Sequence, residues 1–193
     1  YGIYSGASCD FEVEGMKLGS RLLVLGYGNP ARLDDGLGPA FADAVEDRGL
    51  SGVSVDIDYQ LTVEDAALAA EHDMVLFADA SINAPPPFSL SRLQPRVGLG
   101  FTSHSVEPEA ILALAAQIRG TSPQGFALGI RGYDFDDFGE GLSPEATQNL
   151  VAAVEEMVPV IMRRELRAAS TVWAPTRDVA AGQVMEEVGN ARR

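Results

Sequence analysis

Three polar side chains stand at or just after the ends of predicted strands, and their types suit metal binding or the activation of water. Asp35 follows a short apolar run, Asp79 comes directly after the apolar run 74–78, and His104 lies shortly before a predicted helix. In an open α/β sheet, the segments that follow parallel strands meet at one edge. Two carboxylates and an imidazole are suitable ligands for a divalent transition metal with open positions for water. We therefore expect Asp35, Asp79 and His104 to converge at this edge.

Each of these residues also has a simpler interpretation. Asp35 could cap a helix that begins at Gly36. Asp79 could be satisfied in a turn, although a carboxylate next to a buried strand is costly to bury without a partner. His104, in the segment Thr102–Ser105, could cap the following helix or face solvent.

Two neighbouring polar residues are assigned other roles. Asp34 would point away from Asp35 on an extended segment, so it is predicted to be a cap or a group that orients Asp35. His72, the second of the two histidines, lies in the charged turn Glu71-His72-Asp73 and is predicted to be a surface residue.

The glycine-rich turn after the first strand permits a different interpretation, a nucleotide-binding domain. Gly26-x-Gly28-x-x-Ala31 matches the relaxed dinucleotide fingerprint. Pro30 and the segment 32–35 delay the helix, however, and the acids in that segment would repel a pyrophosphate. A nucleophilic hydrolase is disfavoured because the chain has no Gly-x-Ser-x-Gly elbow and its only cysteine, Cys9, lies in the N-terminal segment.

The elements that must position these residues alternate between strand and helix. Apolar runs and period-two patterns predict strands, and apolar residues at helical spacing predict helices. The predicted strands cover about 22–25, 53–58, 74–78, 88–92 and 125–130, and the predicted helices cover 36–48, 66–71, 106–118 and 144–161. The last helix has a natural N-cap in Ser143 and a natural first residue in Pro144.

This alternation predicts a single α/β domain, a twisted and mostly parallel five-stranded sheet with helices on both faces in a three-layer arrangement. The domain is expected to span 21–168, between an N-terminal extension over 1–20 and a C-terminal tail over 169–193. A chain of 193 residues is long enough to bury a full core.

The composition narrows the classes of partner. The chain has 28 acidic and 14 basic residues, a net charge of −14, which disfavours nucleic acid and anionic membrane surfaces. One cysteine excludes a disulfide framework and fits a reducing cytoplasm. We find no apolar run of transmembrane length and no signal-peptide pattern, and we expect a cytoplasmic monomer.

The motifs resemble those of a known family. Leu23-Val24-Leu25-Gly26-Tyr27-Gly28-Asn29-Pro30, three residues, then Asp34-Asp35-Gly36-Leu37-Gly38 is similar to the opening signature of the nickel–iron hydrogenase maturation endopeptidases. The resemblance continues, in the family's order, through 76–80, 103–104, 132–133 and 141–145, and covers about residues 21–165.

The resemblance implies an activity and a site. Proteases of this family remove a short C-terminal peptide from the hydrogenase large-subunit precursor after nickel has been inserted. They recognise the nickel through an acid in the first motif, an Asp after the third strand and a His, which correspond here to Asp35, Asp79 and His104. In some members the first of these acids is Glu. The family is classed with the aspartic peptidases, although the paired Asp-Thr-Gly signature is absent.

We therefore expect nickel held by the substrate to be bridged by these three residues, which would position the scissile bond. The attacking water would be activated by the metal or by one of the two aspartates, Asp35 and Asp79, which are the expected catalytic residues. Two alternatives stay open. One is a non-catalytic chaperone that binds the metal or the precursor in the same cleft, and the other is the nucleotide-binding α/β domain.

Overall fold

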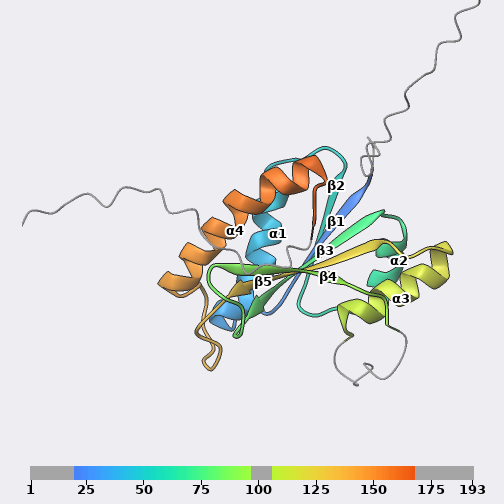
Figure 1. Ribbon diagram of the computed structural model, residues 1–193. Helices are drawn as coiled ribbons and strands as arrows, with labels where there is room; N and C mark the ends of the chain where they lie inside the picture. Colours follow the sequence, from blue (N-terminus) through green and yellow to red (C-terminus); the bar gives the residue numbers. More distant parts are fainter. Residues whose placement is uncertain (1–19, 97–105, 168–193) are drawn as a thin grey trace, which may run out of the picture.

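The computed structural model describes residues 20–96 and 106–167. Within these residues the chain forms a five-stranded sheet flanked by helices, in agreement with the predicted fold class (Figure 1). In chain order the elements are β1 (Leu22–Tyr27), the 3-10 helix η1 (Leu33–Gly36), α1 (Leu37–Glu46), β2 (Val53–Asp58), α2 (Asp65–Ala70), β3 (Met74–Ser81), β4 (Phe88–Leu93), α3 (Pro108–Arg119), β5 (Gln124–Arg131) and α4 (Pro144–Arg163).

The sheet has the strand order β2-β1-β3-β5-β4. β1 runs parallel to both β2 and β3, and β3 runs parallel to β5. β4 is antiparallel to β5 and forms one edge of the sheet, as the sequence predicts for this short strand. The four parallel strands therefore end on the same side, which we call the carboxyl edge.

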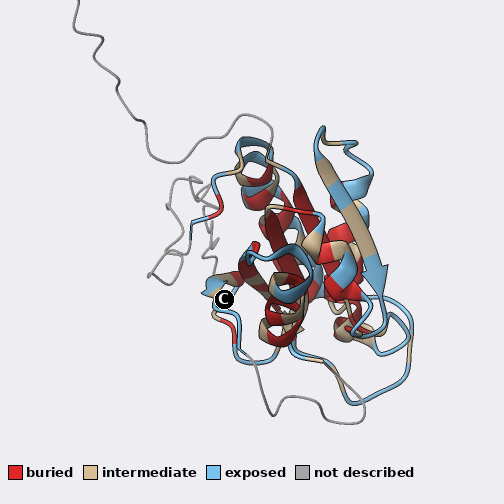
Figure 2. Cartoon of the chain, turned by 90° about the vertical axis from the view of Figure 1, so that its right-hand side faces the viewer, coloured by how far each residue is buried: buried red, intermediate tan, exposed pale blue. Residues whose placement is uncertain are grey.

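The helices divide between the two faces of the sheet because the side chains of each strand alternate between them. Leu22 and Val24 of β1 belong to the larger core cluster, which α1 and α4 cover. Leu23 and Leu25 face the opposite way, into a second cluster under α2 and α3. Figure 2 shows the resulting layers, with buried strands between helices whose outer sides are exposed. The three-layer arrangement explains why β1 is an unbroken apolar run.

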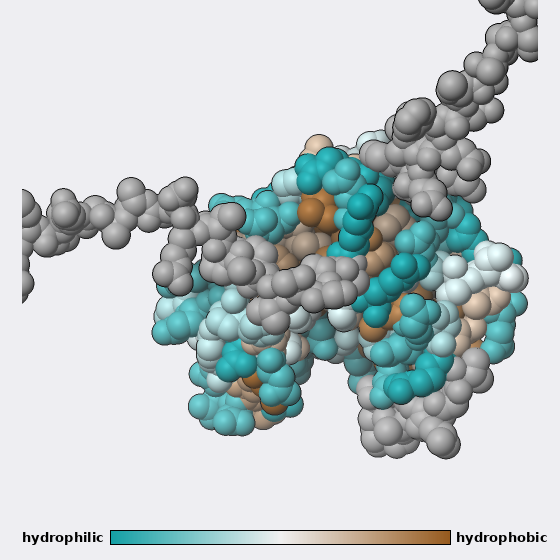
Figure 3. Space-filling model, in the orientation of Figure 1, coloured by the Kyte–Doolittle hydropathy of each residue, from teal (hydrophilic) through white to brown (hydrophobic). Residues whose placement is uncertain are grey.

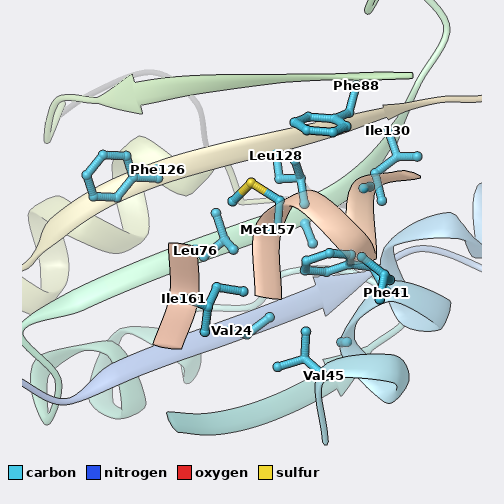
Figure 4. Packing of buried hydrophobic residues seen from close by; sticks show 14 of the residues in the cluster. Val24, Phe41, Val45, Leu76, Phe88, Phe126, Leu128, Ile130, Met157 and Ile161 are labelled. Atoms are coloured by element: carbon cyan, nitrogen blue, oxygen red, sulfur yellow. The ribbon is translucent and has the colours of Figure 1, made fainter. Parts of the chain in front are cut away.

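The larger cluster interlocks α4 with α1 and the centre of the sheet (Figure 4). Met157 and Ile161 of α4 lie between Phe41 of α1 and strand residues such as Leu76 and Phe126. All five side chains are buried. This packing fixes the second half of α4 against α1 and the sheet.

The beginning of α4 follows the sequence signals. Ser143 accepts a hydrogen bond on its Oγ from the Ala146 N–H at 3.2 Å, and Pro144 occupies the first turn.

Among the described residues, no helix has the length and apolar character that spanning a membrane requires.

The beginning of α1 packs against the strands at very short range. A Cβ on Gly38 would lie 2.3 Å from the Tyr27 carbonyl oxygen and 2.5 Å from the Ala78 carbonyl oxygen. A side chain at this position would push the helix away from β1 and β3. Gly38 therefore brings η1, which precedes α1, next to the ends of these two strands.

Candidate active site

The site lies where neighbouring strands connect to opposite faces of the sheet. β1 leads through α1 on one face to β2, whereas β2 leads through α2 on the other face to β3. The chain therefore diverges between the ends of β1 and β3, and such switch points are where open α/β sheets place their binding sites. The pairing of β1 with β3 ends at Gly26 and Ala78, so Asp79 is the first residue of β3 beyond it.

Asp79 lies within β3, which continues to Ser81 alongside β5, rather than in a turn after the strand. Its carboxylate accepts a hydrogen bond from the Ala80 N–H at 2.7 Å and another from the Tyr27 hydroxyl. Burial raises its pKa to about 6, and the negative charge of Asp35 adds to this rise against the opposing hydrogen bonds. Asp79 therefore changes its charge close to neutral pH.

Asp35 is brought to the same switch point by η1. Its carboxylate accepts a hydrogen bond from the Asn29 N–H at 2.9 Å. Asp35 does not cap α1: the N-cap position is Gly36, and no side chain caps that helix. Since the charge of Asp35 contributes to the raised pKa of Asp79, the two carboxylates lie near one another at the switch point.

Tyr27 is a residue of the site that was not predicted from the sequence. It ends β1, and both burial and the neighbouring Asp79 raise the pKa of its hydroxyl, so that Tyr27 stays protonated as a donor. Glu109, at the beginning of α3, also contributes to this shift and therefore faces the same region. The only sequence signal for Tyr27 was its position at the end of a buried strand.

His104 lies outside the described residues, so its position relative to the carboxylates stays a prediction. Among the residues that are described, no three His, Cys, Asp or Glu side chains gather in a way that could hold a metal ion. The described site thus contains two of the three predicted metal ligands. α3, the helix expected after His104, begins at Pro108.

Asp34 is fully buried and anchors the site to a distant loop. Its carboxylate accepts hydrogen bonds from the N–H groups of Tyr133 (2.8 Å), Asp134 (3.0 Å) and Ser143 (2.7 Å), and from the Ser143 hydroxyl (2.8 Å). Burial alone would raise its pKa, but these hydrogen bonds outweigh burial and lower it. Asp34 is therefore a structural group, charged at neutral pH, that fixes η1, in line with its predicted supporting role.

The loop 132–143, which joins β5 to α4, also pairs with the backbone around η1. Gly139 accepts from the Leu33 N–H at 3.2 Å and donates to the Ala31 carbonyl at 2.9 Å. These contacts hold Leu33 at a φ of 51°, an unfavourable value for a residue with a side chain. The sequence analysis included the two ends of this loop in the family resemblance but gave the loop no role.

Gly28 allows η1 to approach the end of β1. Its φ is 137°, and a Cβ there would lie 2.1 Å from the carbonyl oxygen of Asp35. Gly28 therefore allows η1 to place Asp35 next to the end of β1.

The assignment of His72 to the surface was wrong. His72 is only 4% exposed, with Nδ1 2.9 Å from the Leu68 carbonyl oxygen and Nε2 2.8 Å from the Ser54 hydroxyl. The turn is charged, but its histidine points inward between the end of α2 and β2. His72 lies at the opposite end of β3 from Asp79 and is a structural residue.

The fold and the site define an open α/β protein with an interacting pair of carboxylates at its switch point. Comparison with known proteins shows which members of this class the chain is similar to. The chain is 27% identical over 177 residues to the hydrogenase expression/formation protein HupD of Thiocapsa roseopersicina, an alignment that covers 83% of this chain and 78% of that protein. No family model matches the chain.

Solved structures show the same relation at the level of the fold. The maturation protease HycI of Thermococcus kodakarensis has a TM-score of 0.57 at 17% identity, over 74% of this chain and 92% of HycI. The hydrogenase maturating endopeptidase HybD of E. coli has a TM-score of 0.56 at 22% identity, over 75% and 93% of the two chains. The chain has the fold of the hydrogenase maturation proteases, and these comparisons confirm the resemblance to that family.

Proposed function

We propose that this chain is an endopeptidase that removes a C-terminal peptide from the nickel-loaded precursor of a hydrogenase large subunit. The observation that carries the proposal is the pair Asp35 and Asp79, held at the switch point by separate elements and coupled through their charges. The family resemblance supports the substrate class, because HybD and HycI are named as maturation proteases of hydrogenases.

We assign the roles of the residues from the family resemblance. Asp35, Asp79 and His104 would bind the nickel that the precursor carries, since carboxylate and imidazole groups are ligands that nickel accepts. Because the metal is fixed in the substrate, its capture would place the scissile peptide bond against the two carboxylates. A carboxylate oxygen would then take a proton from the attacking water. Nickel is in this scheme part of the substrate, and its presence is the condition for cleavage.

The pH dependence tests this assignment. A metal and a proton compete for the same carboxylate, so Asp79 must be ionised to bind nickel. With a pKa of about 6, cleavage should rise as the pH increases through 6 and then level off. If protonated Asp79 acted instead as a general acid on a peptide bond, cleavage would decline over the same interval.

The direct experiment is mass spectrometry of the large-subunit precursor, loaded with nickel or free of it, before and after addition of this chain. We expect the loss of a C-terminal peptide in the nickel-loaded sample alone. Asp79→Asn should abolish the loss. Asp73→Asn is the matched control, because Asp73 lies just before β3, at the end of that strand opposite to Asp79, and forms an ion pair with Arg119. Cleavage should persist in this variant. Equal cleavage of nickel-free precursor would refute the requirement for nickel.

The same experiment separates the non-catalytic alternative. A chaperone would bind the nickel-loaded precursor and leave its mass unchanged. The nucleotide-binding alternative gains no support from the turn after β1. The Asn29 N–H, which a phosphate would need, is donated to Asp35, and the turn leads into η1 with its two acids.

A further inference from the structure

Large apolar side chains are exposed mainly around the carboxyl edge. In the described part of the chain nine large hydrophobic residues are exposed, and six of them lie at the ends of β2, β3 and β5 or in the segments that follow. These six are Ile57, Tyr59, Val63, Ile82, Tyr133 and Phe138. The most exposed are Phe138, at 84%, and Tyr59, at 70%. Concentrated apolar exposure of this kind marks surfaces that bind other macromolecules.

The loop 132–143 carries two of the six residues in fixed positions. The guanidinium of Arg32 lies 5.7 Å from the ring centre of Phe138 and donates to the Phe135 carbonyl at 3.0 Å. Gly139, the next residue after Phe138, is paired with the backbone around η1. Phe138 is thus exposed and also anchored directly beside the segment that carries Asp35.

A second arginine joins the segments after β3 and β5. The guanidinium of Arg131 lies 5.0 Å from the ring centre of Tyr133 and donates to the carbonyl of Ile82. The Tyr133 hydroxyl is 3.3 Å from the Asn149 side-chain nitrogen of α4. An exposed aromatic group that is already held in place loses little entropy when a partner covers it.

The charges around these side chains specify the chemistry of the partner. Between 132 and 141 the chain has four acidic residues, Asp134, Asp136, Asp137 and Glu140, and no basic residue. The basic groups of Arg32 and Arg131 lie against the rings of Phe138 and Tyr133, so the acids of the loop outnumber them. All four are exposed, as is Asp58 at the end of β2. In Figure 3, brown apolar residues interrupt a largely teal surface at the lower left, where this loop lies. A second copy of the chain would bring like charges together, whereas a basic surface would be attracted.

We propose that the segments after β2, β3 and β5 form a docking surface for the folded body of the precursor, through a face that carries apolar side chains flanked by Lys and Arg. This inference rests on the proposed function and adds a second point of recognition outside the carboxylate site. The anchored Phe138 is its central contact. The precursor would be held by its folded surface while its C-terminal segment enters the switch point.

The test compares exposed apolar residues at the carboxyl edge with equally exposed ones elsewhere. Phe138→Ser and Ile82→Ser are the test variants, and Ile118→Ser on α3 and Met162→Ser on α4 are the controls. Ile82 and Met162 are both 60% exposed, and Ile118 is 62% exposed, so these three substitutions remove comparably exposed groups, whereas Phe138 is more exposed, at 84%. Steady-state cleavage of the nickel-loaded precursor gives KM and kcat, and circular dichroism confirms folding.

We expect Phe138→Ser to raise KM about tenfold with kcat unchanged, as for the loss of an anchoring aromatic side chain. Ile82→Ser should raise KM by a smaller factor, and the two controls should match the unsubstituted chain. Binding of the precursor to Asp79→Asn, which cannot cleave it, should weaken to the same extent when Phe138→Ser is added.

The outcomes separate the docking surface from the proposed function. If the unsubstituted chain cleaves the precursor and Phe138→Ser leaves KM unchanged, the docking surface is wrong and the proposed function stands. If the unsubstituted chain binds the precursor without cleaving it and Phe138→Ser weakens this binding, the proposed function is wrong and the docking surface stands. Equal effects of the test and control variants would overturn the inference. The inference would also be overturned if sedimentation showed that the unsubstituted chain forms a dimer and that Phe138→Ser dissociates it.

Discussion

Replacing Asp79 by Asn should stabilise the protein at neutral and alkaline pH. Burial is the main reason why the pKa of Asp79 rises from its ordinary value of 3.8 to about 6, so its charged form is disfavoured in the folded chain. Because one pKa unit corresponds to about 1.4 kcal/mol, the ionised group lowers the free energy of unfolding by about 3 kcal/mol. Asn has the shape of the neutral acid and keeps an oxygen that can accept from the Ala80 N–H.

The sign of this effect follows from the two pKa values. Below pH 3.8 the acid is neutral in both the folded and the unfolded state and has no net effect. As the pH rises from 3.8 through 6, the unfolded chain releases the proton first, and the stability of the protein with Asp79 falls. Above pH 6 the difference is constant. The advantage of Asn should thus be about 0.5 kcal/mol at pH 4 and about 3 kcal/mol at pH 8.

Urea denaturation followed by circular dichroism, at pH 4 to 8 with EDTA, measures this difference directly. Asp73→Asn provides a control of the opposite sign, because hydrogen bonds from Arg119 and the Arg21 backbone lower the pKa of Asp73. Its loss of stability should grow as the pH rises. The reasoning fails if Asp79→Asn is no more stable than the unsubstituted chain at pH 8, or if its advantage is the same at pH 4.

Three further substitutions test the framework of the site. Asp34→Asn should lower the free energy of unfolding, measured in urea titrations, by at least about 3 kcal/mol, because the NH2 group of the new amide would face N–H donors of the loop. A loss below about 1 kcal/mol would contradict the anchoring role of the four hydrogen bonds. Gly28→Ala should displace η1 and abolish cleavage, since its Cβ would overlap the Asp35 carbonyl oxygen; full activity with an unchanged melting temperature would show that the turn opens freely. His72→Ala should lower the free energy of unfolding at pH 8 by about 1–3 kcal/mol, because the hydrogen bonds to Leu68 and Ser54 are lost. An unchanged free energy of unfolding would contradict the buried, structural role of His72.

The fold was largely predictable because its signals are local. The apolar run of β1 and the Ser143-Pro144 start of α4 each reflect the physical demands of one element. The placement of Asp35 and Asp79 at one edge of the sheet follows from the general rule for the ends of parallel strands. This rule places residues at an edge without reference to any particular long-range contact.

The unpredicted features depend on contacts between distant segments. His72 is buried because Ser54 lies beside it, although they are 18 residues apart, and the charged residues around His72 gave the opposite impression. Tyr27 gained a role only because β3 continues past the end of its pairing with β1. The role of the loop 132–143 could not be read from its glycines and acids, since its partner Asp34 is about 100 residues away.

The anchor at Asp34 also has a consequence for the order in which the protein acquires activity. Its partners Tyr133 and Ser143 follow it by 99 and 109 residues, whereas Asp79 follows Asp35 closely in the chain. During synthesis from the N-terminus, both carboxylates leave the ribosome well before the donors that hold η1. A nascent chain that ends before Ser143 would carry the reactive acids on an unfixed segment. On the proposed function, competence to cleave would therefore arise late, together with the completion of the fold.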